Sequence, residues 1–449
     1  MNTARSGGPP STAVKPGPGA SGAASKQATR RARTAVLGAG IGTFIEWYDF
    51  IAYAFLATVM AQLFFPSESA AVGLLSTFAA FGISFVVRPL GGVILGAIAD
   101  RRGRRFALTI AVVGMAAASF LIGLLPSAAA IGVAAPALLV LLRVIQGLSA
   151  GGESVSAASY LIEEAPDGRR GFFTNFVNVG VIGGMFTASL LVSILRLVVD
   201  AHALFDWAWR IPFLLSLPMG VAAVIIRKLM DESRAFEHLK TEGIVQRAPI
   251  REAFRREGRG ITVTALLTLS IQAGYYLIFT YSASYLQTQG LMSGTGASWA
   301  IVLALGLTAA TLPCWSRLSD RFGRRPVQIA TNLGFIVLLL PMYLLMTVSP
   351  GWAVLALVVL GQVCSVSLSA QWVTLTELFP ATLRATGLGI GYNLATIIGG
   401  TTPFVATWLL SVTGRPQSSA LYVSVLAAVS LLTAVFLLKE TGRSPLRED

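Results

Sequence analysis

Long apolar runs recur along the chain from Thr34 to Leu438 and are separated by short polar segments. A membrane-spanning helix needs about 20 mostly apolar residues, and a water-soluble core is too small to cover so many runs of that length. The pattern predicts an all-α integral membrane fold with twelve spanning helices. Their ranges are 34–61, 71–99, 106–126, 136–162, 172–198, 211–230, 260–288, 296–318, 327–348, 352–378, 387–412 and 420–438.

An approximate repeat divides these helices into two groups of six. The segment Gly96–Arg105 (GAIADRRGRR) follows the second predicted span, and Ser316–Arg325 (SRLSDRFGRR) follows the eighth. Parallel halves of this kind are typical of secondary transporters, with a substrate site between them near the bilayer midplane. The predicted parts are a disordered basic tail (1–33), a first half (34–230), a charged cytoplasmic linker (231–258), a second half (259–438) and a short cytoplasmic tail (439–449).

Charge is distributed unevenly over the predicted loops. The chain of 449 residues is 54% hydrophobic and has a formal net charge of +13, which in a soluble protein would suggest nucleic acid. Here nearly all cations fall on one side of the membrane, and only Arg196, Arg210 and Arg415 fall on the other. By the positive-inside rule, both termini are predicted to be cytoplasmic, and no nucleic-acid partner is expected.

Residues that could hold a cofactor do not cluster. Cys314 and Cys364 fall inside predicted spans, and His202 and His238 lie in different loops. The chain contains no Gly-x-x-x-x-Gly-Lys-Ser/Thr run that would cradle a nucleotide phosphate. We therefore expect no metal, no cofactor and no enzymatic activity, and a transporter built this way must be secondary.

Five ionisable residues interrupt the apolar runs of the first half: Glu46, Asp49, Arg88, Arg143 and Glu153. A charge at bilayer depth costs roughly 2.5–3.5 kcal/mol on insertion scales, and it usually faces a polar cavity, a partner charge or a transport route. Glu46 and Asp49 are three residues apart, so on a helix they share a face. These charges predict a functional polar cluster in the membrane.

Several motifs resemble known families. The loop Gly96-x-x-x-Asp-Arg-x-Gly-Arg-Arg, with its partial second copy, resembles the signature loop of the major facilitator superfamily. Within it, five further motifs together resemble the metabolite:proton symporter family. They are Glu46-Trp-Tyr-Asp-Phe, Arg88-Pro-Leu-Gly-Gly, the run from Arg143 to Glu153 (RVIQGLSAGGE), Trp209-Arg210-Ile-Pro-Phe and Gly399-Gly-Thr-Thr-Pro403. The resemblance covers nearly the whole chain after the tail and implies a bacterial inner-membrane protein.

The two signature loops predict a latch between the halves. Asp100 is placed to accept hydrogen bonds from the free amides that begin the eleventh helix near 385–387, and Asp320 to do the same at the fifth helix near 168–171. Arg101, Arg104 and Arg105 are expected to pair with Glu163, Glu164 or Glu377. The alternative is that these arginines only anchor the loops to lipid headgroups. The predicted gating residues are Asp100, Arg101, Gly103, Arg104, Glu163, Asp320, Arg321, Gly323, Arg324 and Glu377.

Arginine remains charged and can hold a carboxylate with two parallel hydrogen bonds. We therefore expect Arg88 to anchor a substrate carboxylate, with Arg210 as second choice; the alternative for Arg88 is a structural pair with Glu46 or Glu153. Other predicted substrate contacts are Tyr48, Tyr276, Gln371 and Asn393. Glu46 is the first candidate for the proton carrier, followed by Asp49 and Glu153, with Arg143 as a partner charge.

The resemblance implies proton-coupled uptake of a small organic acid, such as alpha-ketoglutarate or citrate, by alternating access. Two alternatives remain open: symport of a zwitterion such as proline or betaine, and proton-driven drug export, against which a buried Arg88 weighs. A receptor or an enzyme is disfavoured because the sequence shows neither a soluble sensory domain nor a catalytic constellation. The expected partners are the solute, protons and the lipid bilayer, and we expect a monomer.

Overall fold

The computed structural model describes residues 40–102, 104–163, 165, 169–228, 249–442 and 446, and within these ranges the regular structure is helical. Among the described residues, eleven helices are long and apolar enough to cross a membrane, and a bent pair, Gly40–Phe55 with Ala57–Phe64, brings this number to twelve if it is counted as one span. The predicted all-α membrane fold is confirmed. The predicted tail 1–33, most of the linker 231–258 and the loop residues Gly103 and Glu164 lie outside the described residues.

The first part of the chain contributes the bent first span and the helices up to Lys228. After the helix Gly40–Phe55 these are α2 (Ala57–Phe64), α3 (Ala70–Val86), α4 (Arg88–Arg102), α5 (Arg104–Leu124), α6 (Ala128–Ile131), α7 (Ala134–Ser149), α8 (Glu153–Glu163), α9 (Arg170–Thr174), α10 (Phe176–Val198), α11 (Ala201–Asp206), the 3₁₀ turn η1 (Ala208–Arg210), α12 (Ile211–Leu214) and α13 (Ser216–Lys228).

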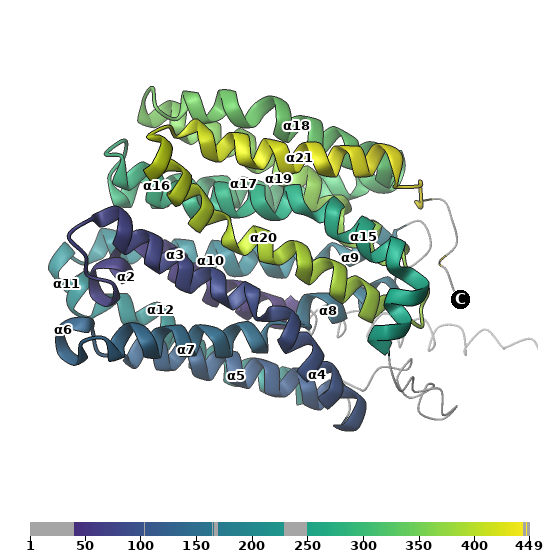
Figure 1. The fold of residues 1–449 in the computed structure, drawn as a ribbon, viewed down its shortest axis with the longest axis horizontal. Coiled ribbons are helices and arrows are strands. Elements are labelled where there is room, and N and C mark those ends of the chain that lie inside the picture. The colour runs from purple at the N-terminus through teal and green to yellow at the C-terminus, as the bar shows by residue number, and fades with distance from the viewer. Residues whose placement is uncertain are drawn as a thin grey trace, which may run out of the picture.

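The second part contains longer continuous helices. They are α15 (Pro249–Tyr276), the π-helical turn η2 (Leu277–Tyr281), α16 (Ser282–Thr288), α17 (Gly294–Phe322), α18 (Arg324–Leu345), α19 (Pro350–Glu377), α20 (Arg384–Thr413) and α21 (Gln417–Phe436). In Figure 1 the helices α17, α18, α19 and α21 lie in the upper part of the picture and α5 and α7 in the lower part, and the long helices run side by side. Helix α3 packs against α20, and α10 packs against α17, so these pairs join the two parts.

The bundle has two ends. Helices α8, α17, α19 and α21 finish at the right-hand end of Figure 1, which we call the C-terminal end; α6, α11 and α16 lie at the opposite end (Figure 1). The interface between the two parts runs from one end to the other along α3, α10, α17 and α20. Residues that cross this interface therefore decide which end is closed.

Several predicted spans are interrupted, and three of the interruptions take part in the contacts described below. The first span bends by 65° at Leu56, the second span breaks at Val87 between α3 and α4, and the fourth span breaks between α7 and α8. At two of them a backbone carbonyl accepts a side-chain hydrogen bond, Ala150 from Arg88 and Phe55 from Arg196. Irregular backbone in a membrane is tolerated only where protein or water satisfies such groups. The breaks therefore create polar positions at membrane depth.

Glycines allow the broken helices to touch. A Cβ added at Gly147 would lie 2.1 Å from the Ser84 carbonyl oxygen, and one at Gly151 would lie 2.2 Å from the Gly92 amide nitrogen. No side chain fits at such distances from backbone atoms. Small residues at four-residue spacing thus let α7 approach α3 and α4 closely, as they do in other transmembrane helix pairs.

Candidate functional site

Arg88 begins α4, directly after the break in the second span, and its side chain is 1% exposed. The guanidinium forms an ion pair with Glu46, and its Nε donates a hydrogen bond of 3.2 Å to the Ala150 carbonyl oxygen at the α7–α8 break. Ser154 Oγ donates weakly to Glu46, at 3.5 Å. Arg88 Nη1 is buried and has no hydrogen-bond partner among the described residues. Arg88 is therefore positioned by two contacts and retains one donor group for a ligand.

Aromatic rings surround this arginine. Its guanidinium carbon lies 5.9 Å from the centre of the Phe50 ring and 5.8 Å from that of Phe85. The Phe85 ring lies 5.2 Å from the Tyr276 ring, which stacks on Trp47 at 5.8 Å with an interplanar angle of 26°. Because Trp47 belongs to the first span and Tyr276 to α15, the stack crosses the interface between the two parts.

Unpartnered donors gather on the facing helices. Tyr276 and Tyr392 interact electrostatically with Arg88, and Gln272 hydrogen-bonds to Tyr392. Buried nitrogen and oxygen atoms with no hydrogen-bond partner among the described residues include Arg88 Nη1, Trp47 Nε1, Tyr276 Oη, Gln272 Nε2 and Gln371 Nε2. All five groups can donate a hydrogen bond. Buried donors without a partner suit a ligand that carries acceptors, and a carboxylate above all.

Asp49 and Arg143 form a separate polar network inside the first part. Ser216 donates to the Asp49 carboxylate, and Ser119 also hydrogen-bonds to it. Gln146 Nε2 donates to Ser119 at 2.6 Å, and Gln146 Oε1 accepts from Arg143 Nη1 at 2.7 Å. The shared-face argument for Glu46 and Asp49 predicted one cluster. The structure instead gives the two acids different partners, because the first span packs between several neighbours.

Two predicted substrate contacts have other partners. Tyr48 Oη donates to the Pro212 carbonyl oxygen at 2.9 Å. Arg210 Nη1 donates to the carbonyl oxygens of Gly123 and Leu125, both at 2.8 Å, and its guanidinium lies 4.5 Å from the Trp209 ring centre. Arg210 therefore satisfies the free carbonyls at the end of α5. In this conformation the structure brings neither side chain to Arg88.

Asn393 joins the site from the other part of the chain. Its Nδ2 donates to the Gly151 carbonyl oxygen at 3.0 Å, next to the carbonyl of Ala150 that holds Arg88. Glu153 begins α8 and is buried. Gln371 lies on α19 beside Trp372, whose ring is 4.7 Å from that of Tyr392. The α7–α8 break therefore collects polar side chains from both parts.

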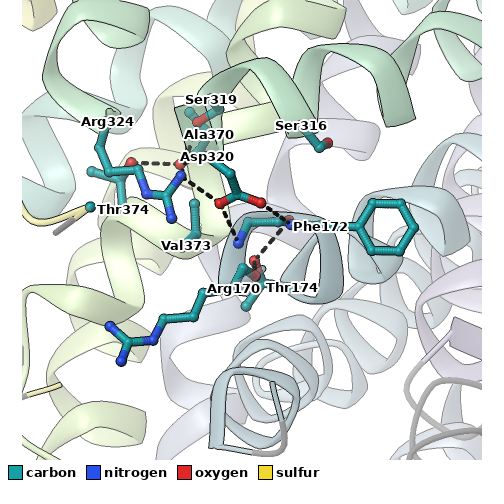
Figure 2. Close-up of polar contacts among 12 residues, drawn as sticks. Arg170, Phe172, Thr174, Ser316, Ser319, Asp320, Arg324, Ala370, Val373 and Thr374 are labelled. Atoms are coloured by element: carbon teal, nitrogen blue, oxygen red, sulfur yellow. Dashed lines mark hydrogen bonds and ion pairs between the residues drawn. The ribbon is translucent and has the colours of Figure 1, made fainter. Parts of the chain in front are cut away.

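At the C-terminal end, Asp320 makes the contact that the sequence predicts. Its carboxylate oxygens accept hydrogen bonds from the backbone amides of Gly171 (3.0 Å) and Phe172 (3.1 Å) at the start of α9, as Figure 2 shows. Arg324 Nη1 lies 2.8 Å from the same carboxylate, and Arg324 Nε lies 3.5 Å from Glu377. Of these four contacts, the two bonds to the amides cross between the parts.

The described ion pairs of this end involve other arginines than those predicted. Glu163 pairs with Arg384 at 3.1 Å, and Glu377 pairs with Arg324 and accepts from Thr441 Oγ1 at 2.6 Å. The packing of α8, α19 and α20 brings these arginines within reach. The pairing of Arg101, Arg104 or Arg105 with Glu163, Glu164 or Glu377 stays a prediction. The side chains of Asp100, Arg101, Arg104 and Arg105 lie outside the described part of the chain, as does Gly103.

The remaining gating candidates have clear positions. Arg321 is exposed and lies 6.0 Å from the Phe322 ring centre. Gly323 ends α17 with φ of +100°, a conformation that favours glycine, and a Cβ there would lie 2.6 Å from a carboxylate oxygen of Glu440. That carboxylate accepts from the amides of Arg324 (2.9 Å) and Arg325 (3.1 Å) and so caps the start of α18.

Sequence reasoning missed two further contacts across the bundle. Asn178 Nδ2 donates to the Leu368 carbonyl oxygen at 2.7 Å, and Trp372 Nε1 donates to Asn178 Oδ1 at 3.0 Å, so these bonds join the two parts. At the opposite end, Arg196 Nη2 donates to the Phe55 carbonyl oxygen at 3.2 Å, where the first span bends. The two asparagines at positions 175 and 178 of an otherwise apolar span were the available signal for the first contact.

Comparison with known proteins gives consistent matches. The family model described as "Sugar (and other) transporter" matches residues 35–248, and that described as "Major Facilitator Superfamily" matches residues 291–448. The chain is 32% identical over 428 residues to the glycine betaine/proline/ectoine/pipecolic acid transporter OusA of Dickeya dadantii, covering 93% of this chain and 85% of the relative.

Two Escherichia coli proteins are similarly related. The shikimate transporter is 36% identical, covering 92% of this chain and 96% of the relative, and the alpha-ketoglutarate permease is 34% identical, covering 91% and 94%. Among solved structures, the proton:xylose symporter XylE superposes with a TM-score of 0.75 at 18% identity, covering 94% of this chain and 98% of that one. At this identity the superposition supports the fold alone.

Proposed function

The chain belongs to the major facilitator superfamily and to its proton-coupled symporters, and from this premise we propose that it takes up a small organic acid by alternating access. The solutes we favour are a dicarboxylate such as alpha-ketoglutarate or a tricarboxylate such as citrate. The predicted halves, 34–230 and 259–438, would be the two bodies that move. We place both termini in the cytoplasm of a bacterial cell, with the transporter acting as a monomer.

One observation carries the substrate proposal, namely the unpartnered Nη1 of Arg88. A buried donor on a charged guanidinium is costly to leave unsatisfied, so a ligand that satisfies it gains affinity. A carboxylate is the natural partner because it accepts two parallel hydrogen bonds. Tyr276, Gln272 and Trp47 offer neutral donors from the surrounding helices. Asn393 would complete the site from α20, and Gln371 from α19.

Coupling to protons follows from the pair of Arg88 with Glu46. An arriving carboxylate competes with Glu46 for the guanidinium, and a buried carboxyl that loses its cation is more stable in the neutral form. Glu46 then takes a proton from the side that is open, and solute and proton cross together. Asp49, held by Ser216 and Ser119, is the second candidate for the carrier, and Glu153 is the third.

Gating is assigned to contacts that cross the interface. At the C-terminal end we propose that the bonds from Asp320 to the amides of Gly171 and Phe172, together with the pair of Glu163 and Arg384, break when that end opens. Asp100, Arg101, Gly103 and Arg104 are proposed to form the matching latch of the first signature loop. Arg321, Arg324, Gly323 and Glu377 would support the second loop.

A second candidate is symport of a zwitterion such as proline or betaine. Trp47, Tyr276 and Phe85 present aromatic faces near Arg88, and such faces attract ammonium groups by about 0.5–2 kcal/mol. A carboxylate on Arg88 and a cationic group on these rings would fit one zwitterion. Relatives whose names include proline and betaine also support this candidate.

The test is solute-driven proton movement in proteoliposomes, with alpha-ketoglutarate, citrate, shikimate, proline and betaine compared under an imposed membrane potential. A signal with an organic acid that Arg88→Gln abolishes supports the main proposal, whereas a signal with proline or betaine alone replaces it with the zwitterion candidate. Arg210→Gln is the matched control, because Arg210 holds backbone carbonyls. Glu46→Gln should uncouple solute movement from proton movement; proton movement that persists in this variant transfers the role to Asp49.

A further inference from the structure

A basic pocket opens beside the Asp320 latch. It has a volume of about 370 Å³, and its lining residues are Arg169, Phe172, Arg317 and Asp320. Arg169 precedes α9 in the first part of the chain, and Arg317 lies on the last turns of α17 in the second part. The pocket therefore lies across the interface, with one arginine from each side.

The two arginines are available to a ligand. Both are exposed, and the Arg317 guanidinium lies 5.6 Å from the centre of the Phe172 ring, close enough for a cation–π contact. In Figure 2 the Phe172 ring points away from the Asp320 carboxylate. The negative charge of Asp320 is already matched by two amide donors and Arg324. The pocket consequently presents two positive charges that suit an anion with several oxygen acceptors.

The surroundings of the pocket favour a lipid over a soluble anion. Arg317 and Asp320 lie at the end of a helix long and apolar enough to span the membrane, which places them at the boundary between acyl chains and headgroups. On the next face of the same helix, Leu318 is 37% exposed and Phe322 is 60% exposed. A basic rim beside exposed apolar side chains matches a phosphate attached to acyl chains.

We propose that this pocket binds the phosphate of an anionic phospholipid and that the bound headgroup bridges the two parts of the transporter. Arg169 and Arg317 separate when the C-terminal end opens, so the lipid binds the closed end better than the open end. By linkage, it shifts the equilibrium toward closure at this end. The proposal concerns a regulatory lipid site and does not depend on which solute is carried.

The first measurement is native mass spectrometry of the full chain with phosphatidylglycerol and phosphatidylcholine of identical acyl chains. Removing one arginine contact should lower the preference for phosphatidylglycerol about fivefold, so Arg169→Gln and Arg317→Gln are each expected to show this loss. Arg317→Lys keeps the charge and should retain most of the preference. Arg415→Gln is the matched control, since it removes the same charge from an exposed position at the opposite end of the bundle and should leave the preference unchanged.

Two results would overturn the proposal. One is equal retention of phosphatidylglycerol by the wild type and by the double variant of Arg169 and Arg317. The other is displacement of the lipid by glycerol 3-phosphate at equal concentration, which would identify the ligand as a soluble phosphate ester. In support, phosphatidylglycerol should slow hydrogen exchange at the Gly171 and Phe172 amides in the wild type and not in Arg169→Gln. None of these measurements requires transport, so they remain informative if the proposed solute is wrong.

Discussion

Replacement of Asp320 by Asn tests how the C-terminal end is held closed. The Asp320 carboxylate accepts two backbone amide bonds from α9 and one contact from Arg324, and its side chain is 12% exposed. The contact with Arg324 lies within one part of the chain and persists when the end opens, so only the two amide bonds count. The amide side chain introduced by Asp320→Asn would keep one of these bonds without its charge and lose the other.

The magnitude follows from the value of a hydrogen bond to a charged group, about 1.5–3 kcal/mol. Losing one such bond and weakening the second shifts the free energy between closed and open states by about 2 kcal/mol. This corresponds to a rise of about 30-fold in the ratio of open to closed molecules. We expect the variant to favour opening at the C-terminal end, while its helical content stays unchanged.

The assay is distance measurement between spin labels on exposed positions of α10 and α17, at Val179→Cys and Phe322→Cys, with Cys314 and Cys364 replaced by Ser. The control is Glu252→Gln, which removes a carboxylate paired with Arg256 inside a single helix. The latch would be refuted if the ratio of open to closed molecules in Asp320→Asn stayed within twofold of the wild-type ratio. The control Glu252→Gln should also stay within twofold of the wild type.

Three further predictions concern other parts of the fold. Gly151→Ala places a Cβ within 2.5 Å of backbone atoms and should prevent stable folding, which is measured as loss of the monodisperse purified protein. In the control Gly152→Ala, the added Cβ meets no atom within 4 Å, so this variant should fold normally. Burial raises the pKa of Glu440, but three backbone amides and a nearby guanidinium lower it more, so the net pKa is below the usual value of a glutamate. The ionised Glu440 carboxylate should therefore contribute its full stabilisation of the folded protein above about pH 5 and lose it as the pH falls further. The difference in melting temperature between the wild type and Glu440→Gln should shrink in acid. A difference that grows in acid would contradict this reasoning. Gly294→Ala places a Cβ 2.3 Å from Arg196 Nη1 and should displace the Arg196 side chain from the Phe55 carbonyl. A cysteine introduced at the end of the bundle opposite the C-terminal end should then react faster with a membrane-impermeant thiol reagent. Unchanged reactivity would show that Arg196 does not hold this end closed.

Features that depend on neighbours along the chain could be predicted well. The spanning helices follow from the length of each apolar run, because lipid forces every backbone group to find its hydrogen bond inside the helix. The contact of Asp320 follows from its place in the repeated loop, since an anion after one helix and free amides at the start of another attract each other. The burial of Glu46 and Arg88 follows from their positions within apolar runs.

Choices among several partners could not be predicted in this way. The sequence did not point to Arg384 or Arg324 as partners of Glu163 and Glu377, and the packing of α8, α19 and α20 brings these arginines into contact with them. Arg210 looked available for a substrate until the end of α5 placed two carbonyl oxygens within its reach. Sequence separation contains no information on these distances.

The sequence by itself therefore determined the membrane fold, the repeat and the presence of buried charges, all of which depend on local composition and spacing. Only the packing of the helices shows that Glu46 pairs with Arg88 while Asp49 bonds to Ser216, that the break between α7 and α8 supplies the carbonyl that holds Arg88, and that a basic pocket forms between α9 and α17. The physical reason is that electrostatic and hydrogen-bond energies depend on separations of a few ångströms between segments far apart in the chain.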